Sequence, residues 1–486
     1  MLSPLKCEEE VIFAANPGRV RLNIFNMFSK ETYIARRAKL KQAIGSGLLL
    51  FLGNDETGVN YADNTYDFRQ DSTFLYFFGL PYAGLSAVID IDNDREIIFG
   101  DELTIDAIVW MGTQPTLKEK SEATGLKEVR PFKEIESYLK QAQQKGQTIH
   151  YLPTYRAEHQ IKLFQWLGIL PGAEKPSVPF IMGVVNQRIY KSAEEIAEIE
   201  KACDVTAEMH LAAMRTVRPG IKESVVAAAV AEAAYAHNYG LSFPIIATIN
   251  GQTLHNHDHS HLIKSGDMLL LDAGAETEMG YAGDMSSTIP ADMKFTTRQK
   301  EIYDIQVAAH ETAVAALRPG VRFVDVYELS CKTIMEGLKD LGFVKGDPME
   351  AVKAGAHAMF MPCGLGHMMG LDVHDMENLG EVYVGYNGQP KSTQFGRKSL
   401  RLGRELEPGF VLTIEPGVYF IPELMDLWRS QNKFTEFINY DKLFTYKDFS
   451  GIRNEEDYLI TETGARRLGK RIPLHTDEVE AEHCQL

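Results

Sequence analysis

The pattern of hydrophobic and polar residues predicts helices and strands in the N-terminal part of the chain. In KETYIARRAKLKQAI (30–44), apolar residues recur among basic ones at helical spacing. LLLFLG (48–53) is expected to form a buried strand, and AVIDIDNDREIIFG (87–100) two strands around a polar turn. The segment FRQDSTFLYFFGL (68–80), rich in aromatic and polar residues, is expected to form a strand and turn that pack the core, with a direct role in catalysis as the alternative. These elements predict one α/β domain.

A second part of the chain begins with a long amphipathic helix. PSVPFIMGVVNQRIYKS (176–192) reads as a connector, and Ser192 and Glu195 have the spacing of a capping box. The helix is expected to run to about residue 217, where Pro219-Gly220 stops it. We therefore predict an N-terminal domain over 1–185 and a C-terminal domain over 186–486.

The second part contains a faint internal repeat. Shifting the chain by one hundred residues aligns Asp204 with Asp304, His210 with His310, Ala213 with Ala313, and Arg218-Pro219-Gly220 with Arg318-Pro319-Gly320. In each copy a helix is expected to end at the Arg-Pro-Gly sequence, a second helix follows, and strands come next. The repeat predicts two similar α/β halves, with side chains from both halves meeting at a pseudo-twofold cleft.

Five residues in short, distinctive contexts are candidate metal ligands. They are Asp272 in LLLDAGAE, Asp284 in YAGDMSST, His367 in GLGHMMGLDVHD, Glu415 in VLTIEPGVY and Glu455 in GIRNEED. Four carboxylates and one imidazole suit two adjacent divalent cations, and the absence of thiolates from the set argues against a structural zinc. Manganese is the expected metal, with zinc and cobalt as alternatives. A bridged pair of metals suggests activation of water for hydrolysis.

The apolar pattern places these ligands on strands. Residues 268–271 form a short strand that ends at Asp272, and a turn over 276–280 leads to a second strand carrying Asp284. A hairpin would bring the two aspartates together. A further strand over 410–414 is broken by a Pro-Gly pair directly after Glu415.

The segment GIRNEEDYLIT (451–461) leaves a choice between two glutamates. Alternation puts Glu455 on one face of a strand and Glu456 on the other. The neighbours of Glu456 on its face are apolar, which favours Glu455 as the residue that faces the cleft.

Composition narrows the class of protein. The 486 residues include 50 basic and 67 acidic side chains, for a formal charge of −17, which disfavours nucleic acid and anionic membrane surfaces as partners. The N-terminus has no apolar segment of a signal peptide, and GLLLFLG (47–53) is too short to cross a bilayer. The five cysteines lack a CxxC pattern and read as reduced thiols. A cytoplasmic enzyme is expected.

These motifs resemble those of the "pita-bread" metallopeptidases, which include methionine aminopeptidase, proline dipeptidase and aminopeptidase P. The resemblance is close to the proline-specific branch, over TLHNHDHSHLIKSGDMLLLDAGAE, GLGHMMGLDVHD, LTIEPGVY and GIRNEEDYLITETG. FRQDSTFLYFFGL resembles the N-terminal domain of aminopeptidase P. Together the two resemblances extend from about residue 35 to about residue 470. They imply a creatinase-like N-terminal α/β domain and a C-terminal pita-bread α/β domain.

The resemblance also implies a role for each site residue. Asp272 would bind one metal through both carboxylate oxygens, Asp284 and Glu455 would bridge the two metals, and His367 and Glu415 would complete the other. His255 and His374 match histidines that hold the substrate or stabilise the intermediate, Arg453 matches a supporting arginine, and Glu415 would take the proton of the attacking water.

The implied reaction is hydrolysis of the peptide bond that precedes proline. We favour an aminopeptidase that releases the first residue from proline-containing peptides, and a dipeptidase specific for Xaa-Pro is the alternative. A metal-free relative that only binds partners or, like creatinase, performs other chemistry is opposed by the five intact ligand positions. Relatives with this N-terminal domain are commonly dimers or tetramers, so a homodimer or homotetramer is expected.

Three features depart from the family pattern or remain ambiguous. Cys363 stands where the family often has histidine, which leaves open how the residue C-terminal to the scissile bond is held. The segment 420–451 is a long insert that forms either a lid over the substrate or a surface excursion or subunit contact. In the tract HNHDHSH (255–261), only His255 is expected to reach the cleft, although a separate metal site is an alternative.

Overall fold

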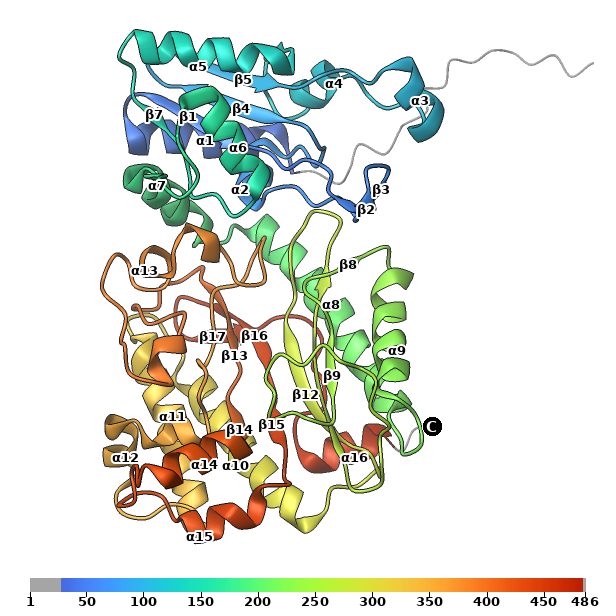
Figure 1. Cartoon of the computed structure of the whole chain (residues 1–486), viewed down its shortest axis with the longest axis vertical. Coiled ribbons are helices and arrows are strands. Elements are labelled where there is room, and N and C mark those ends of the chain that lie inside the picture. The colour runs from blue at the N-terminus through green and yellow to red at the C-terminus, as the bar shows by residue number, and fades with distance from the viewer. Residues whose placement is uncertain (1–27, 484–486) are drawn as a thin grey trace, which may run out of the picture.

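The computed structural model describes residues 28–483, which form an N-terminal part stacked on a larger C-terminal part (Figure 1). The N-terminal part is built on a mixed five-stranded sheet of order β6-β5-β4-β1-β7. Its strands are β1 (Leu48–Leu52), β4 (Ser86–Asp90), β5 (Arg95–Phe99), β6 (Glu128–Arg130) and β7 (Ile149–His150). Its helices are α1 (Lys30–Ile44), α2 (Ser72–Phe78), α3 (Ile105–Met111), α4 (Leu117–Glu122), α5 (Ile135–Gln144), α6 (Ala157–Leu167) and α7 (Val178–Arg188). A small hairpin of β2 (Gly58–Tyr61) and β3 (Asn64–Thr65) completes it.

Strand β1 shows how the sheet organises the core of this part. Leu49 and Phe51 point into one cluster of buried side chains, which extends into the C-terminal part. Leu48 and Leu50 point into a second cluster, with side chains of α5 and α6. Both faces of the sheet are therefore covered, which explains why β1 is a continuous apolar run. The predictions for α1, β1, β4 and β5 are confirmed.

The prediction of a strand and turn over 68–80 is wrong, because residues 72–78 form the helix α2. The Asp71 side chain accepts a hydrogen bond from the Phe74 N–H and caps the start of the helix. Gly79, with a φ of 61°, ends it in the left-handed conformation. An apolar run buried on all sides has no periodicity that separates helix from strand, so the caps were the informative signal.

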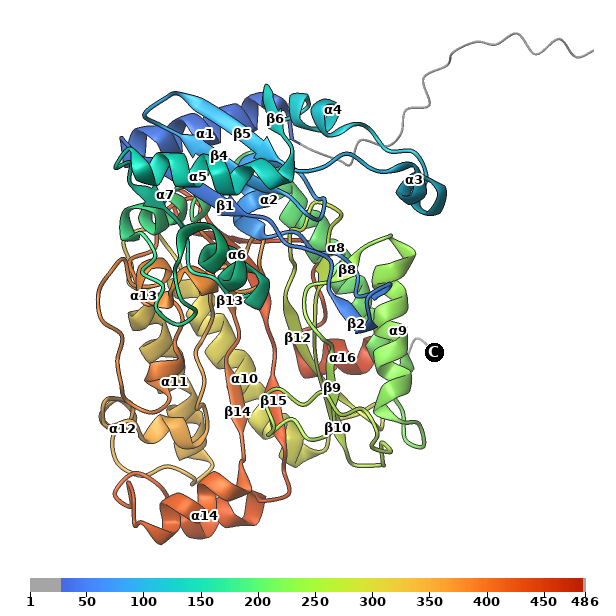
Figure 2. The same cartoon turned by 45° about the horizontal axis from the view of Figure 1, so that its top comes forward.

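The C-terminal part consists of two halves of similar construction. The first half holds α8 (Ala193–Thr216), α9 (Glu223–Ala236), β8 (Gly240–Leu241), β9 (Ile246–Thr248), β10 (Met268–Ala273), β11 (Ala275–Glu276) and β12 (Met285–Pro290). The second half holds α10 (Thr297–Ala316), α11 (Phe323–Asp340), α12 (Pro348–Ala354), α13 (Glu381–Val384), β13 (Val411–Ile414), β14 (Gly417–Tyr419), α14 (Pro422–Ser430), α15 (Tyr440–Leu443), β15 (Gly451–Arg453), β16 (Glu456–Ile460), β17 (Ala465–Arg467) and α16 (Thr476–His483). Strands of both halves lie between the helices in the two views (Figure 1, Figure 2).

The internal repeat of the sequence corresponds to a repeat of structure. Helices α8 and α10 both end just before an Arg-Pro-Gly sequence, and α8 begins with the predicted capping box of Ser192 and Glu195. The N–H of Gly220 donates to the carbonyl of Ile263, and that of Gly320 donates to Leu406, each at 2.9 Å. The α/β architecture with a pseudo-twofold C-terminal part is thus confirmed.

The connection between the two parts runs through α7. The boundary predicted after residue 185 falls inside this helix, where Gly183 lies against Leu40 of α1. Within residues 28–483, no helix combines the length and the apolar character that a membrane crossing requires.

The insert over 420–451 folds as α14, α15 and their connections at the end of the C-terminal part farthest from the sheet of the N-terminal part (Figure 1). It is anchored by a bridge between Val344 and Ile438 and by edge-on packing of Tyr446 against Phe343, with ring centroids 4.7 Å apart. These contacts make the insert an integral part of the outer wall of the domain.

Candidate metal centre

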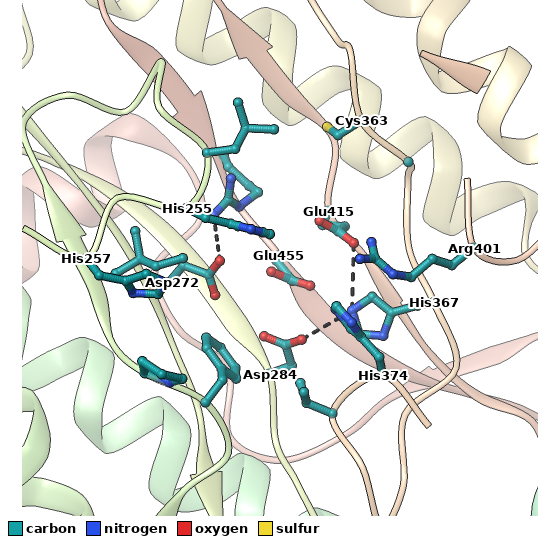
Figure 3. A pocket seen from close by; sticks show the side chains of 17 residues that line it. His255, His257, Asp272, Asp284, Cys363, His367, His374, Arg401, Glu415 and Glu455 are labelled. Carbon is teal, nitrogen blue, oxygen red and sulfur yellow. Dashed lines mark hydrogen bonds and ion pairs between the residues drawn. The ribbon is translucent and has the colours of Figure 1, made fainter. Parts of the chain in front are cut away.

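All eight candidate site residues line one cavity of about 210 Å³ between the two halves of the C-terminal part. They are His255, Asp272, Asp284, His367, His374, Glu415, Arg453 and Glu455. In Figure 3 the side chains of the first half lie on one side and those of the second half face them, with Glu455 between. The cleft that the repeat predicts is therefore present.

Strands β10 and β12 position the two aspartates. They pair in antiparallel fashion with Asp272 opposite Ser286, so the predicted hairpin exists. Asp284 does not lie within the second strand but directly before it, and its N–H donates to Asp457 at 3.1 Å. The carboxylate of Asp457 thus holds the backbone of Asp284, whose side chain lines the cavity.

The second half places His367 and Glu415 on adjacent segments. Glu415 follows β13 directly, and its N–H donates to the carbonyl of Leu365 at 2.8 Å. The N–H of Thr413 donates to the carbonyl of His367 at 3.0 Å. The segment that carries His367 therefore runs beside the end of β13, and the side chains of His367 and Glu415 both line the cavity.

Glu455 faces the cavity, as the strand alternation favoured, and Glu456 does not line it. The hydroxyl of Ser286 donates to Glu455 at 2.8 Å. Glu456 instead accepts a hydrogen bond from the Tyr458 hydroxyl at 2.7 Å and lies 3.6 Å from Arg467. The two neighbouring glutamates therefore have separate environments.

Arg453 supports three of the groups around it. Its guanidinium donates to Asp272 Oδ2 at 2.5 Å, to the Ser286 hydroxyl at 2.9 Å and to the Tyr419 hydroxyl at 2.9 Å. The planar, fixed donors of arginine suit such a network. Arg453 thus holds Asp272 directly and Glu455 through Ser286.

The site concentrates negative charge where water is excluded. Burial, followed by the charge of Glu455, raises the pKa of Asp284 well above its ordinary value. Burial, followed by the charges of Glu415 and Asp272, does the same to the pKa of Glu455. Burial also raises the pKa of Glu415. Crowded buried carboxylates are stabilised by bound cations, so this donor set fits metal ions.

Three of the candidate ligands form a compact group. Single ligand atoms of Asp284, His367 and Glu455 all lie within 4.8 Å of one another. His367 Nε2 is 3.3 Å from Asp284 Oδ2 and 3.8 Å from Glu415 Oε1. Its Nδ1 lies 3.1 Å from the carbonyl of Met368 and can donate to it, which leaves the Nε2 lone pair for a metal. Burial lowers the pKa of His367 well below its ordinary value, so the ring is neutral, as a ligand must be.

Asp272 offers one open oxygen to a metal. Its Oδ1 is buried and has no hydrogen-bond partner among the described residues, whereas its Oδ2 accepts from Arg453. A buried carboxylate oxygen without a hydrogen-bond partner is suited to coordinate a cation. Binding through both oxygens, which the resemblance implies, would require Oδ2 to be shared with the arginine.

Two further histidines face the cavity with different support. His374 Nδ1 lies 2.6 Å from Glu377, whose pKa is lowered to about 2 chiefly by this hydrogen bond. The ring nitrogen left for a ligand of the cavity is therefore Nε2. Burial, followed by Arg453, lowers the pKa of His255, which favours its neutral form.

The histidine tract behaves differently from the prediction, because His257 lines the cavity as well as His255. His259 Nε2 contacts the carbonyl of Ile245 at 3.1 Å, and His261 Nδ1 lies 2.9 Å from the buried Glu223. These two side chains are structural, and the alternative of a separate metal site finds no support in the described part of the tract.

Arg401, which no motif of the sequence indicates, also lines the cavity with its side chain. It lies in a polar loop without a recognisable motif, so only its position in the fold reveals it. Its Nε donates to Glu377 at 3.2 Å, next to His374. Arg401 therefore adds a cation to a cavity of carboxylates and histidines.

Cys363 and the insert have different relations to the cavity. Cys363 lines it, and burial followed by the charge of Glu415 raises the pKa of its thiol to about 12. The side chain is therefore a neutral thiol. Ile421 packs in a cluster with Cys363, but no residue of 420–451 lines the cavity, which supports the interpretation of the insert as a surface excursion or subunit contact over a lid.

Comparison with known proteins adds two family matches. Residues 197–462 match Metallopeptidase family M24, and residues 33–150 match the Aminopeptidase P, N-terminal domain. The first match covers both halves of the C-terminal part with all five candidate ligands. The second covers the sheet of the N-terminal part.

Similar proteins extend over almost the whole chain. The Xaa-Pro aminopeptidase of Escherichia coli (strain K12) is 32% identical over 472 residues, which cover 93% of this chain and 97% of the relative. The Xaa-Pro dipeptidase of Homo sapiens is 29% identical, covering 92% of this chain and 91% of the relative. The structure of proline aminopeptidase P II from Yersinia pestis superposes with a TM-score of 0.78 at 28% identity, covering 94% of this chain and 100% of that one. A solved Escherichia coli aminopeptidase P with zinc in place of its metal, in complex with product, has a TM-score of 0.76 at 29% identity and covers 94% of this chain and 99% of that one.

Proposed function

The chain belongs to metallopeptidase family M24, and we propose that it is an Xaa-Pro aminopeptidase. It would release the N-terminal residue from peptides whose second residue is proline. Membership of the family makes the protein a metal-binding hydrolase; the substrate, the identity of the metal and the number of ions are part of the proposal.

One observation carries the proposal. The five metal-ligand candidates, together with His255, His374, Arg401 and Arg453, come from both halves of the C-terminal part and line the same cavity. The chain that forms this cavity is similar to an Xaa-Pro aminopeptidase over 93% of its length. Site and full-length similarity therefore point to the same chemistry.

We propose that Asp272, Asp284, His367, Glu415 and Glu455 hold two divalent ions, with manganese as the native metal. The oxygen-rich donor set and the orphaned Asp272 Oδ1 support this choice. When bound, such ions supply Lewis acidity and lower the pKa of a water to about 7.

The side chains of the chain itself would supply orientation and proton transfer. Glu415, in a buried setting that raises its pKa, is suited to accept the proton of the attacking water. The proline nitrogen carries no hydrogen in the peptide bond, so it must receive a proton to leave as an amine. Glu415 and His374 both line the cavity and are the candidate donors. His255 is the candidate to stabilise the carbonyl oxygen as it gains charge.

A specific observation also favours the alternative of an Xaa-Pro dipeptidase. Arg401 places a cation in the cavity, and a dipeptide would bring a free carboxylate directly after its proline. The side chain is already hydrogen-bonded to Glu377, which reduces its capacity for a second anion. We therefore retain the aminopeptidase as the first choice.

The choice can be tested with two peptides. Manganese-loaded protein is expected to release the first residue from a longer Xaa-Pro-Pro peptide, measured by chromatography of the products. A Gly-Pro dipeptide is the comparison, and the longer peptide with alanine in place of the second residue is the control. Cleavage confined to the dipeptide would establish the alternative, and cleavage of neither proline peptide would contradict both.

We further propose that the protein is a homodimer or homotetramer that uses α3 in its contact. None of the residues of this helix is buried in the single chain, and it projects from the body of the N-terminal part (Figure 1). Ile105, Val109 and Met111 are exposed, and Trp110 is 86% exposed. Adjacent exposed apolar side chains of this size are typical of an interaction surface.

Replacing Ile105, Val109 and Trp110 together with serine is expected to reduce the assembly to single chains, measured by light scattering. Leu170→Ser removes another exposed apolar residue of the N-terminal part, 59% exposed, and should leave the assembly unchanged. A wild-type protein with the mass of one chain, or a triple variant with the wild-type mass, would refute this contact.

A further inference from the structure

We infer that Arg69 is a positioning residue that holds the two halves of the metal centre at a fixed separation, an inference whose kinetic part rests on the proposed function. Arg69 belongs to the N-terminal part, in the segment 68–80 that is expected from the sequence to pack the core. Its side chain instead leaves that part and contacts both halves of the C-terminal part.

The contacts with the first half involve the connection between two metal-ligand candidates. Arg69 Nε lies 2.9 Å from each carboxylate oxygen of Glu276, and one of its terminal nitrogens donates to the carbonyl of Gly280 at 3.1 Å. Glu276 and Gly280 lie between Asp272 and Asp284 in the chain. Arg69 therefore forms hydrogen bonds with the turn that connects these two aspartates.

The contact with the second half involves the segment between two histidines. The same terminal nitrogen of Arg69 donates to the carbonyl of Leu371 at 2.7 Å. Leu371 lies between His367 and His374. The two segments that Arg69 contacts are also bonded to each other, because the N–H of Ala282 donates to the carbonyl of Gly370 at 2.9 Å. One guanidinium thus bridges the aspartate side and the histidine side of the cavity.

A glycine in the first segment accommodates the guanidinium. Gly280 has a φ of 84°, and a Cβ there would lie 2.9 Å from a terminal nitrogen of Arg69. A side chain at this position would push the arginine away from the turn. The close approach of Arg69 is therefore built into the turn itself.

Neighbours of Arg69 hold the same histidine segment. The Ser72 hydroxyl donates to Asp372 at 2.5 Å, and Arg188 of α7 donates to Asp372 at 2.9 Å and to Asp375 at 2.7 Å. The N–H of Asp375 donates to the carbonyl of Met368, directly after His367, at 2.8 Å. The N-terminal part and α7 therefore fix the segment on either side of His374.

Arginine is required here because the contacts lie in several directions. Its rigid, planar group donates at the same time to a carboxylate and to carbonyls of two loops, whereas lysine has one flexible ammonium. Loss of these bonds would let the turn before Asp284 and the segment after His367 move independently. The spacing of the ligands would then no longer be held, although every ligand would remain.

The test uses Arg69→Lys and Arg69→Met, with Arg37→Lys as the matched control. Outer residues that orient ligands typically contribute 10–100-fold to metal affinity or activity. We expect both Arg69 variants to bind manganese at least about tenfold more weakly by calorimetry, and their kcat to fall at least about tenfold with little change in KM. Ser72→Ala, which deletes one bond to Asp372 and no charge, should give a smaller effect of the same direction.

Arg37 is an informative control because it is another arginine with several hydrogen bonds, to Glu96 and to the carbonyls of Phe77 and Thr124, all within the N-terminal part. Arg37→Lys should lower the Tm but leave manganese affinity and kcat unchanged. Wild-type manganese affinity and kcat in Arg69→Lys and Ser72→Ala would overturn the inference, as would an equal loss of manganese affinity in Arg37→Lys. If wild-type protein cleaves no Xaa-Pro peptide, the proposed function fails, and the manganese affinities of the same variants still decide the inference.

Discussion

Replacing Glu415 with glutamine is expected to lower kcat for peptide hydrolysis by at least about 10³-fold, within the range that a general base contributes. Glutamine keeps nearly the same shape and an oxygen donor but cannot accept a proton at neutral pH. Glu415 lines the cavity with its backbone tied to Leu365, so the change should leave the fold intact. Initial rates with an Xaa-Pro-Pro peptide, together with the Tm, measure both effects.

The adjacent pair Glu455 and Glu456, in the same half of the C-terminal part as Glu415, offers a control. Glu456→Gln makes the same chemical change on a side chain that accepts from Tyr458 and does not line the cavity. Its effect on kcat should be less than about tenfold, since it touches neither substrate nor ligands. Near-normal turnover in Glu415→Gln would remove Glu415 from both proposed proton transfers. Complete loss of turnover in Glu456→Gln would show that Glu456, and not Glu455, is the glutamate that serves the site.

The second large effect concerns Asp284. Asp284→Asn is expected to weaken manganese binding by more than about 100-fold, since even residues that only orient ligands contribute 10–100-fold. The same change should raise the Tm of the metal-free protein at pH 7, because the buried charge repelled by Glu455 and Asp272 is removed. Calorimetry with manganese and thermal unfolding after chelation measure the two effects.

The sign of the pH dependence follows from the raised pKa. The folded protein holds the Asp284 proton more tightly than the unfolded chain, so ionisation costs stability only above the ordinary pKa of about 3.9. The Tm advantage of the metal-free Asp284→Asn variant should therefore be absent below about pH 4 and grow as the pH rises.

Asp375→Asn is the contrasting control, since this buried carboxylate is paired with Lys191 at 2.7 Å and Arg188 at 2.7 Å. Those cations outweigh burial and lower its pKa, so asparagine there should reduce the Tm. A lower Tm in metal-free Asp284→Asn would contradict the interpretation of the site as a cluster of repelling charges.

Local chemistry explains which parts of the fold could be predicted from the sequence. The capping box at Ser192 and the Arg-Pro-Gly sequence after each long helix act through neighbouring residues, and both predictions are confirmed. The segment 68–80 failed because aromatic residues buried on all sides carry no periodic signal. Asp71 and Gly79 formed the one local cue, a cap at each end of a short helix.

The same distinction between local motifs and remote contacts applies to the residues of the site. The five ligand candidates stand in short motifs, so they could be found by reading the chain, and strand alternation separated Glu455 from Glu456. Arg401 and Arg69 could not be found this way, because each acts through contacts with segments remote in sequence. Along the chain, Arg69 is 207 residues from Glu276 and 302 residues from Leu371, although it is hydrogen-bonded to both.

The division of the metal centre between two halves has a consequence for biosynthesis. The first ligand candidate, Asp272, is translated long before Glu455, the last of the five. A nascent polypeptide on the ribosome therefore lacks the complete donor set until that final glutamate has emerged. All five candidate ligands can therefore act together on a metal only after both halves have been synthesised and have folded onto each other.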